Sequence, residues 1–122
     1  MGVGESRLVH EFLDHIVCGR DGKCAIMLKK YPRLAHCEFH KGTTNPICRA
    51  TYLGHRNIVQ LLMKYDADIN RPSSNKRTPI IWASFRENIP MMELLMEYNP
   101  DLTLEDEEEL NALDIAVTRI NY

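Results

Sequence analysis

The chain has 122 residues, of which 44% are hydrophobic and 26% are charged, and its formal net charge is −2. This size and balance are typical of one soluble domain or one short repeat array. A nucleic-acid partner needs clustered Lys and Arg, and a membrane span needs roughly 18 apolar residues in a row; the sequence has neither. We therefore expect no nucleic acid, no membrane and a cytoplasmic or nuclear location.

The four cysteines are Cys18, Cys24, Cys37 and Cys48. Because no secretion signal precedes them, we interpret them as reduced thiols. A zinc site is the alternative, since Cys37 and His40 have the spacing of half a site. The other three cysteines do not complete it, because Cys18 and Cys24 lack the spacing of a paired ligand turn and Cys48 falls within a predicted helix. We expect no metal and no cofactor.

The N-terminal third predicts a helical hairpin. Residues 1–5 are expected to be disordered, and Ser6 is a plausible N-cap for a helix that ends at Val17, because apolar residues follow at spacings of three and four. Gly19 and Gly22 supply a turn, and a second helix from Lys23 to Tyr31 is stopped by Pro32. Residues 33–44 are the least regular part of the chain, and we interpret them as an extended finger.

From Asn45 onward the sequence repeats at a fixed interval, which is the same from Pro46 to Pro79 as from Pro79 to Ala112. Asn45-Pro46-Ile47 returns as Thr78-Pro79-Ile80 and again as Asn111-Ala112-Leu113. The polar residue of each opening can cap a helix, and proline in the first turn lacks only an N–H that would be unpaired anyway. Further helices are predicted near residues 57–65 and from residue 90, and polar stretches between units suit β-hairpin-like loops.

The unit of helix, turn, helix and finger resembles the ankyrin repeat, through NPICRATYLGHRNIVQLLMKYDADIN, TPIIWASFRENIPMMELLMEYNPDL and NALDIAV. The resemblance implies an all-α ankyrin-repeat solenoid. Its expected parts are a capping hairpin and first finger at 6–44, repeats at 45–77 and 78–110, and the start of an incomplete repeat at 111–122. Either the natural chain continues beyond Tyr122, or this last helix caps the array. Lys76 and Glu109 replace the glycines usual in the family's fingers.

The family binds proteins on the concave surface that its finger tips and inner helices form, so the resemblance implies a protein partner there. The positions carried over are Tyr52, Leu53, Ser74, Asn75, Arg77, Phe85, Arg86, Glu107, Glu108, Leu110, Thr118 and Arg119, with Trp82 beside them. Phe39 and His40 could extend the surface into the first finger. The alternative is that Tyr52, Phe85 and Trp82 pack between units.

Two further features of the sequence allow alternative interpretations. The acidic run from Glu105 to Glu109 is either a solvated loop or a device that steers a basic partner. The resemblance also marks Asn70 as a position hydroxylated in some ankyrin proteins, whereas its other role would be to hydrogen-bond the finger backbone.

No nucleophile, base and orienting group converge in the sequence, and His55 matches a structural position of the family, so we expect no enzyme. The predicted function is a non-catalytic protein-binding module. The alternative is a regulatory segment of a longer enzyme or channel that contacts its own chain. We expect a monomer, with self-association through the uncapped C-terminal helix as the exception.

Overall fold

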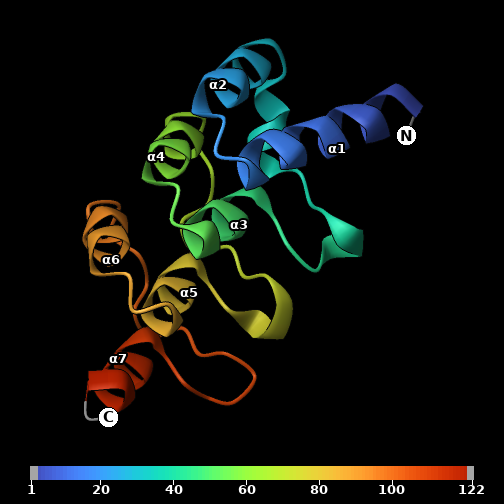
Figure 1. Ribbon diagram of the computed structural model, residues 1–122. Coiled ribbons are helices and arrows are strands. Elements are labelled where there is room, and N and C mark those ends of the chain that lie inside the picture. Colours follow the sequence, from blue (N-terminus) through green and yellow to red (C-terminus); the bar gives the residue numbers. More distant parts are fainter. Residues whose placement is uncertain (1–2, 121–122) are drawn as a thin grey trace.

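The computed structural model describes residues 3–120 and consists of two rows of helices with loops on one side (Figure 1). The α-helices are α1 (Val3–Val17), α2 (Asp21–Lys30), α3 (Pro46–Leu53), α4 (Arg56–Lys64), α5 (Pro79–Phe85), α6 (Ile89–Met96) and α7 (Ala112–Ile120). Three short 3₁₀-helices are η1 (Pro32–His36), η2 (His40–Gly42) and η3 (Ser74–Lys76). The all-α solenoid predicted from the repeat is confirmed.

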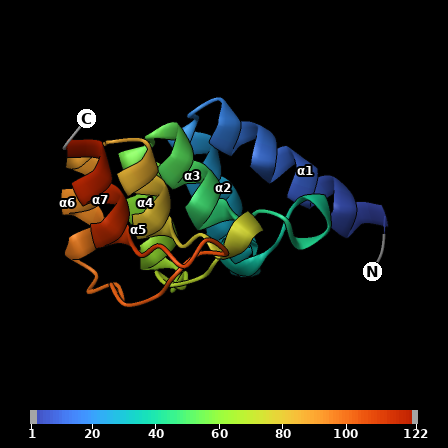
Figure 2. The same ribbon diagram turned by 90° about the horizontal axis from the view of Figure 1, so that it is seen from below.

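Helices α1, α3, α5 and α7 form the inner row, and α2, α4 and α6 form the outer row (Figures 1 and 2). Each inner helix packs on the next, and α5 lies between α3 and α7. The core is a continuous apolar cluster along this stack, and its fully buried members include Ile47, Ile58, Leu62, Ile81 and Leu94. Since each helical pair buries its apolar face against its neighbours, stacking supplies most of the stabilising burial.

Three fingers project from the inner row to one side, seen best in Figure 1: finger 1 (residues 39–44), finger 2 (71–77) and finger 3 (104–110). Each closes through backbone hydrogen bonds: Phe39 N to Thr44 O at 2.9 Å, Ser73 N to Arg77 O at 2.9 Å, and Asp106 N to Leu110 O at 3.0 Å. Among the described residues these turns form only one isolated β-bridge, Phe39 to Thr44. The fingers are therefore hairpin-like turns without named strands.

The N-terminal part differs from expectation in three places. Helix α1 begins at Val3, so of the stretch predicted to be disordered only Met1 and Gly2 lie outside the described residues. Helix α2 begins at Asp21 and includes Gly22, which leaves Gly19, with φ +69°, as the turn glycine. Residues 33–44 are not simply extended, because Pro32 starts the 3₁₀-helix η1, and a second one, η2, follows in finger 1.

The hairpin of α1 and α2 packs on the pair α3 and α4. At this junction His55 lies against Gly19, where an added Cβ would sit 2.9 Å from the His55 ring. This is a structural place for the histidine, as predicted. Ile26 is 65% exposed despite its apolar side chain, because the buried face of α2 carries Cys24, Met27 and Leu28.

The three repeat openings begin their helices in different ways. Asn45 Oδ1 accepts from Cys48 N at 3.0 Å, and Asn111 Oδ1 accepts from Asp114 N at 2.9 Å, as the capping prediction requires. Thr78 does not repeat this solution: its hydroxyl is buried and makes no hydrogen bond to a described residue. Packing therefore holds Thr78, whereas Asn45 also donates to Pro72 O at 3.1 Å and so ties its helix to finger 2.

This difference predicts unequal costs of substitution at equivalent positions. We expect Asn45→Ala to lower the free energy of unfolding by about 2 kcal/mol, because the cap and the bond to Pro72 are both lost. We expect Thr78→Val to change it by less than about 0.5 kcal/mol, since no hydrogen bond is removed. Urea unfolding of the two variants checks this, and equal destabilisation would contradict it.

The turn between the two helices of a repeat requires a left-handed residue. Gly54 fills that place with φ +80°. Glu87, at the equivalent position of the next repeat, adopts φ +54°, where its Cβ crowds the backbone and strains the turn. We expect Glu87→Gly to raise the free energy of unfolding by about 0.5–1 kcal/mol. The control is Gln60→Gly on the exposed side of α4, which should lower it by about 1 kcal/mol. A loss of stability in both variants would refute the strain at Glu87.

Candidate protein-binding surface

The candidate site is the inner face, which we define as the surface formed by α3, α5, α7 and the three fingers. Adjacent fingers are joined along it by backbone hydrogen bonds, Ser74 N to Thr43 O and Glu107 N to Asn75 O, each at 2.9 Å. These bonds fix the spacing of the fingers at the same period as the helices. The inner face is thus a continuous, preformed surface, which lowers the ordering cost of binding.

Aromatic side chains of α3 and α5 meet on the inner face. The rings of Tyr52 and Trp82 pack edge to face with centroids 5.4 Å apart, and Trp82 lies 6.2 Å from the tilted ring of Phe85. Trp82 Nε1 donates to Ser73 Oγ at 2.7 Å, so the indole also braces finger 2. Trp82 and Phe85 are half-buried and Tyr52 is 37% exposed, which makes Tyr52 the most accessible member of this aromatic cluster.

Three arginines cover these rings. The guanidinium of Arg77 lies 4.2 Å from the Phe85 ring centre and 5.1 Å from that of Trp82. Arg86 lies 4.7 Å over Tyr52, and Arg119 lies 5.6 Å over Phe85. Such cation–π contacts hold long side chains in defined places. The aromatic residues therefore pack between units, as the alternative interpretation has it, and they also position the exposed side chains of Arg86 and Arg119. Their role in partner binding stays a prediction.

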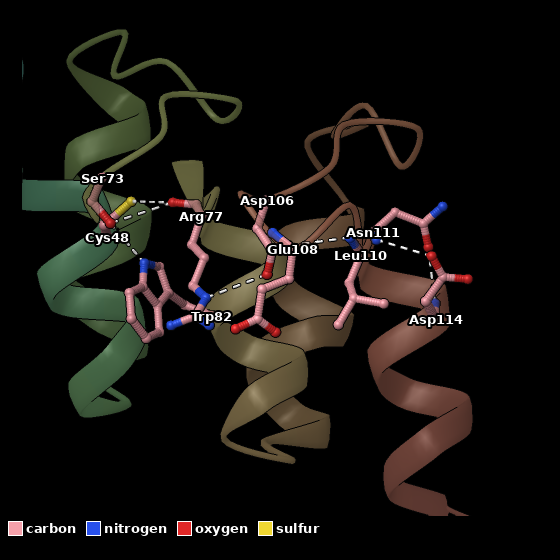
Figure 3. A network of polar contacts seen from close by, with 9 residues as sticks. All are labelled: Cys48, Ser73, Arg77, Trp82, Asp106, Glu108, Leu110, Asn111 and Asp114. Atoms are coloured by element: carbon pink, nitrogen blue, oxygen red, sulfur yellow. Dashed lines mark hydrogen bonds and ion pairs between the residues drawn. The ribbon is translucent and has the colours of Figure 1, made fainter. Parts of the chain in front are cut away.

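Arg77 also connects finger 2 to finger 3 (Figure 3). Its Nε lies 3.4 Å from Oδ2 of Asp106, whose side chain is fully buried. The other oxygen of Asp106 accepts from Glu108 N at 2.8 Å and Leu110 N at 3.1 Å, which shapes the third finger. The sequence suggested that the whole acidic run is solvated. Asp106 is instead a buried structural residue, and its neighbours Glu107 and Glu108 are exposed.

A groove of about 330 Å³ opens on the inner face between finger 1, finger 2 and α3. Its apolar lining is formed by Tyr52, Trp82 and Cys48, and it is also lined by Thr43, Thr44, Ser73 and Ser74 of the two fingers. Arg49 lies in the same groove with its Nε buried and without a hydrogen-bond partner among the described residues. The groove thus brings together a cation, hydroxyls and aromatic rings.

The structure brings most predicted binding residues onto the inner face but gives them different roles. Arg77 and Trp82 are engaged within the protein, and Leu110 packs partly on the core. Exposed side chains are those of Ser74, Asn75, Arg86, Glu107, Glu108, Thr118 and Arg119, and Leu53 is half-buried. Phe39 is only 3% exposed and cannot extend the surface as suggested, whereas its neighbour His40 is exposed and lines the groove.

Sequence reasoning missed Arg49. It stands one repeat period before Trp82, so the repeat places both at the same point of successive inner helices. Trp82 attracted notice as the single tryptophan, and the same register would have identified Arg49.

The remaining residues that the sequence singled out are Asn70 and the cysteines. Asn70 Oδ1 accepts from Asp101 N at 2.8 Å, a bond from one repeat to the next, so the hydrogen-bonding role predicted for Asn70 is confirmed. Burial raises the pKa of the Cys48 and Cys37 thiols to about 12 and that of Cys24 to about 11, which keeps them protonated near neutral pH. Within residues 3–120 no three metal-binding side chains gather, and no helix there is long and apolar enough to cross a membrane.

The comparisons with known proteins agree with this architecture. Residues 47–122 match the family model for ankyrin repeats, in three copies, so the chain belongs to the ankyrin-repeat family. Ankyrin repeats are generally protein–protein interaction modules. An ankyrin repeat protein of fowlpox virus (strain NVSL) is 34% identical over 64 residues, which are 52% of this chain. The match spans only 10% of the viral protein.

The buried carboxylate of finger 3 gives a stability test. We expect Asp106→Ala to lower the free energy of unfolding by about 2–4 kcal/mol, because two backbone N–H groups and the half-buried Arg77 lose their acceptor. Glu107→Ala, next to it and exposed, should stay within about 0.5 kcal/mol of the parent. Denaturant unfolding measures both, and an Asp106→Ala variant as stable as Glu107→Ala would show that the ion pair does not hold the finger.

Proposed function

We propose that the chain is a non-catalytic module that binds a partner protein on its inner face. The observation that carries this proposal is the set of aromatic and arginine side chains held in place across successive repeats. Tyr, Trp and Arg are the residue types that contribute most at binding hot spots, because they bury a large area at modest entropic cost. Tyr52 and Arg86 stand in contact at the accessible edge of this set.

The separation of acidic and basic residues on the inner face supports a partner whose own charges are separated in the complementary way. Finger 3 carries exposed Glu107 and Glu108, whereas the groove and the inner helices carry Arg49, Arg86 and Arg119. In our proposal the acidic finger steers a basic part of the partner by long-range attraction. The association rate should then fall with added salt, and this salt dependence should weaken in a Glu107→Gln, Glu108→Gln variant; an unchanged dependence would exclude steering.

The direct test is a pull-down with a variant in which Tyr52, Phe85 and Arg86 are replaced by alanine. We expect loss of the captured partner, with at least a tenfold weaker affinity, because about 2 kcal/mol or more is typical of hot-spot truncation. The matched control is Arg56→Ala, Lys64→Ala, which removes exposed charges from α4 in the outer row. Binding retained by the inner-face variant, with its fold intact by circular dichroism, would exclude this face.

A second arrangement is favoured by the relation to the viral protein, in which the matched stretch is a tenth of the whole. Here the module would be a regulatory segment of a longer enzyme or channel and would contact its own chain. The same surface would serve, and the partner would be intramolecular. A pull-down that recovers only fragments of the parent polypeptide distinguishes this arrangement from the first.

The remaining parts of the proposal concern state and place. We propose that the chain is a monomer in the cytoplasm or nucleus. Self-association at high concentration would use α7, where Leu113 is 66% and Val117 is 48% exposed. Light scattering over a range of concentrations tests this, and a dimer at all concentrations would contradict it.

Hydroxylation of Asn70 stays a prediction, which mass spectrometry of protein from cells that contain the hydroxylase would test; no added oxygen would exclude it.

A further inference from the structure

The buried Nε of Arg49, which has no hydrogen-bond partner among the described residues, sets this side chain apart from the two arginines of finger 2. Arg77 has Asp106, and Arg71 lies 3.8 Å from Glu38 and donates to the His36 and Cys37 carbonyl oxygens. Arg49 makes no hydrogen bond or ion pair with any residue that the structure describes, although its Nε is buried. A buried donor without an acceptor is costly, and an incoming acceptor would remove that cost.

The surroundings of Arg49 define what could enter. Thr43 and Thr44 of finger 1 and Ser73 and Ser74 of finger 2 line the groove, and the hydroxyls of Thr43 and Ser73 are already bonded to carbonyl oxygens of their own fingers. The remaining hydroxyls, those of Thr44 and Ser74, favour an anionic group together with Arg49. The aromatic wall of Tyr52 and Trp82 favours an apolar neighbour of that group.

The number of cations argues for a carboxylate and not a phosphate. Phosphorylated residues carry up to about two negative charges and are usually recognised by clusters of arginines. In this groove Arg49 is the single arginine, since Arg77 is committed to Asp106 and Arg86 lies over Tyr52. A planar guanidinium matches one carboxylate well, through charge-assisted hydrogen bonds.

We propose that the groove beside Arg49 binds an Asp or Glu side chain of the partner protein, with an apolar residue next to it packed on Tyr52 and Trp82. This rests on the proposed use of the inner face for protein binding. The acidic tip of finger 3, with Glu107 and Glu108, sets the direction of the bound segment. The carboxylate of the segment lies toward finger 1, and its neutral or basic part lies toward finger 3.

The test uses a randomised peptide library displayed on phage and selected on the immobilised intact chain. We expect the selected peptides to share one Asp or Glu beside an apolar residue. In synthetic copies, exchange of that residue for Asn or Gln should weaken binding about tenfold to a hundredfold, the range typical of a charge-assisted hydrogen bond. The protein variant Arg49→Gln should bind the parent peptide more weakly by a similar factor. Its affinity should not fall further when the exchanged peptide replaces the parent peptide.

Matched variants separate the groove from the rest of the face. Arg56→Gln, on the outer row, should bind as the parent does. Arg49→Gln should also unfold at the same urea concentration as the parent, because no described interaction of Arg49 is lost. A clear loss of stability in Arg49→Gln would show that this side chain is structural and would overturn the inference.

The outcomes distinguish this inference from the proposed function. Selected peptides that lose affinity on Tyr52→Ala but bind Arg49→Gln unchanged would overturn the carboxylate site and leave inner-face binding intact. A phosphoserine in place of the selected Asp or Glu that binds more tightly would overturn the choice of a carboxylate. If no selected peptide is sensitive to Tyr52→Ala, both the inference and the proposed function fail.

Discussion

The stacking of each inner helix against its neighbours is the interaction on which the rest of the structure depends. No single helical pair here is large enough to bury its own apolar face, so α5 is held by α3 on one side and α7 on the other. The same stacking brings residues close to one repeat period apart into contact across units, as with Arg77 and Asp106. A surface built from distant residues thus follows from a purely local repeat.

Polar ties convert this stack into a surface with a fixed shape. Asn45 connects α3 to finger 2, Asn70 connects one repeat to the next, and Asp106 holds both finger 3 and Arg77. Asn45 and Asp106 are buried, and buried polar groups add little net stability when satisfied but cost much when their bonds are broken. Their effect is to fix finger positions, and the aromatic rings and arginines between the fingers are fixed with them.

The constant repeat period made the solenoid, the inner and outer helices and the caps at Asn45 and Asn111 predictable. The N-terminal third lacks that register, so the 3₁₀-helices η1 and η2 and the burial of Phe39 could not be anticipated from spacing. Asp106 looked solvated because it stands among four glutamates, and only the meeting of two fingers shows its pairing with Arg77. Arg49 differs, since its register with Trp82 was readable and the sequence analysis did not use it.

The central claim is that a partner protein occupies the inner face and leaves the outer row free. Hydrogen–deuterium exchange of the chain with and without a bound partner tests it most directly, because exchange reports on backbone groups of every element. The account predicts slower exchange on binding at fingers 1 and 2 and at the turn after α3, with α4 and α6 unchanged. Slower exchange confined to α4 and α6 would contradict it.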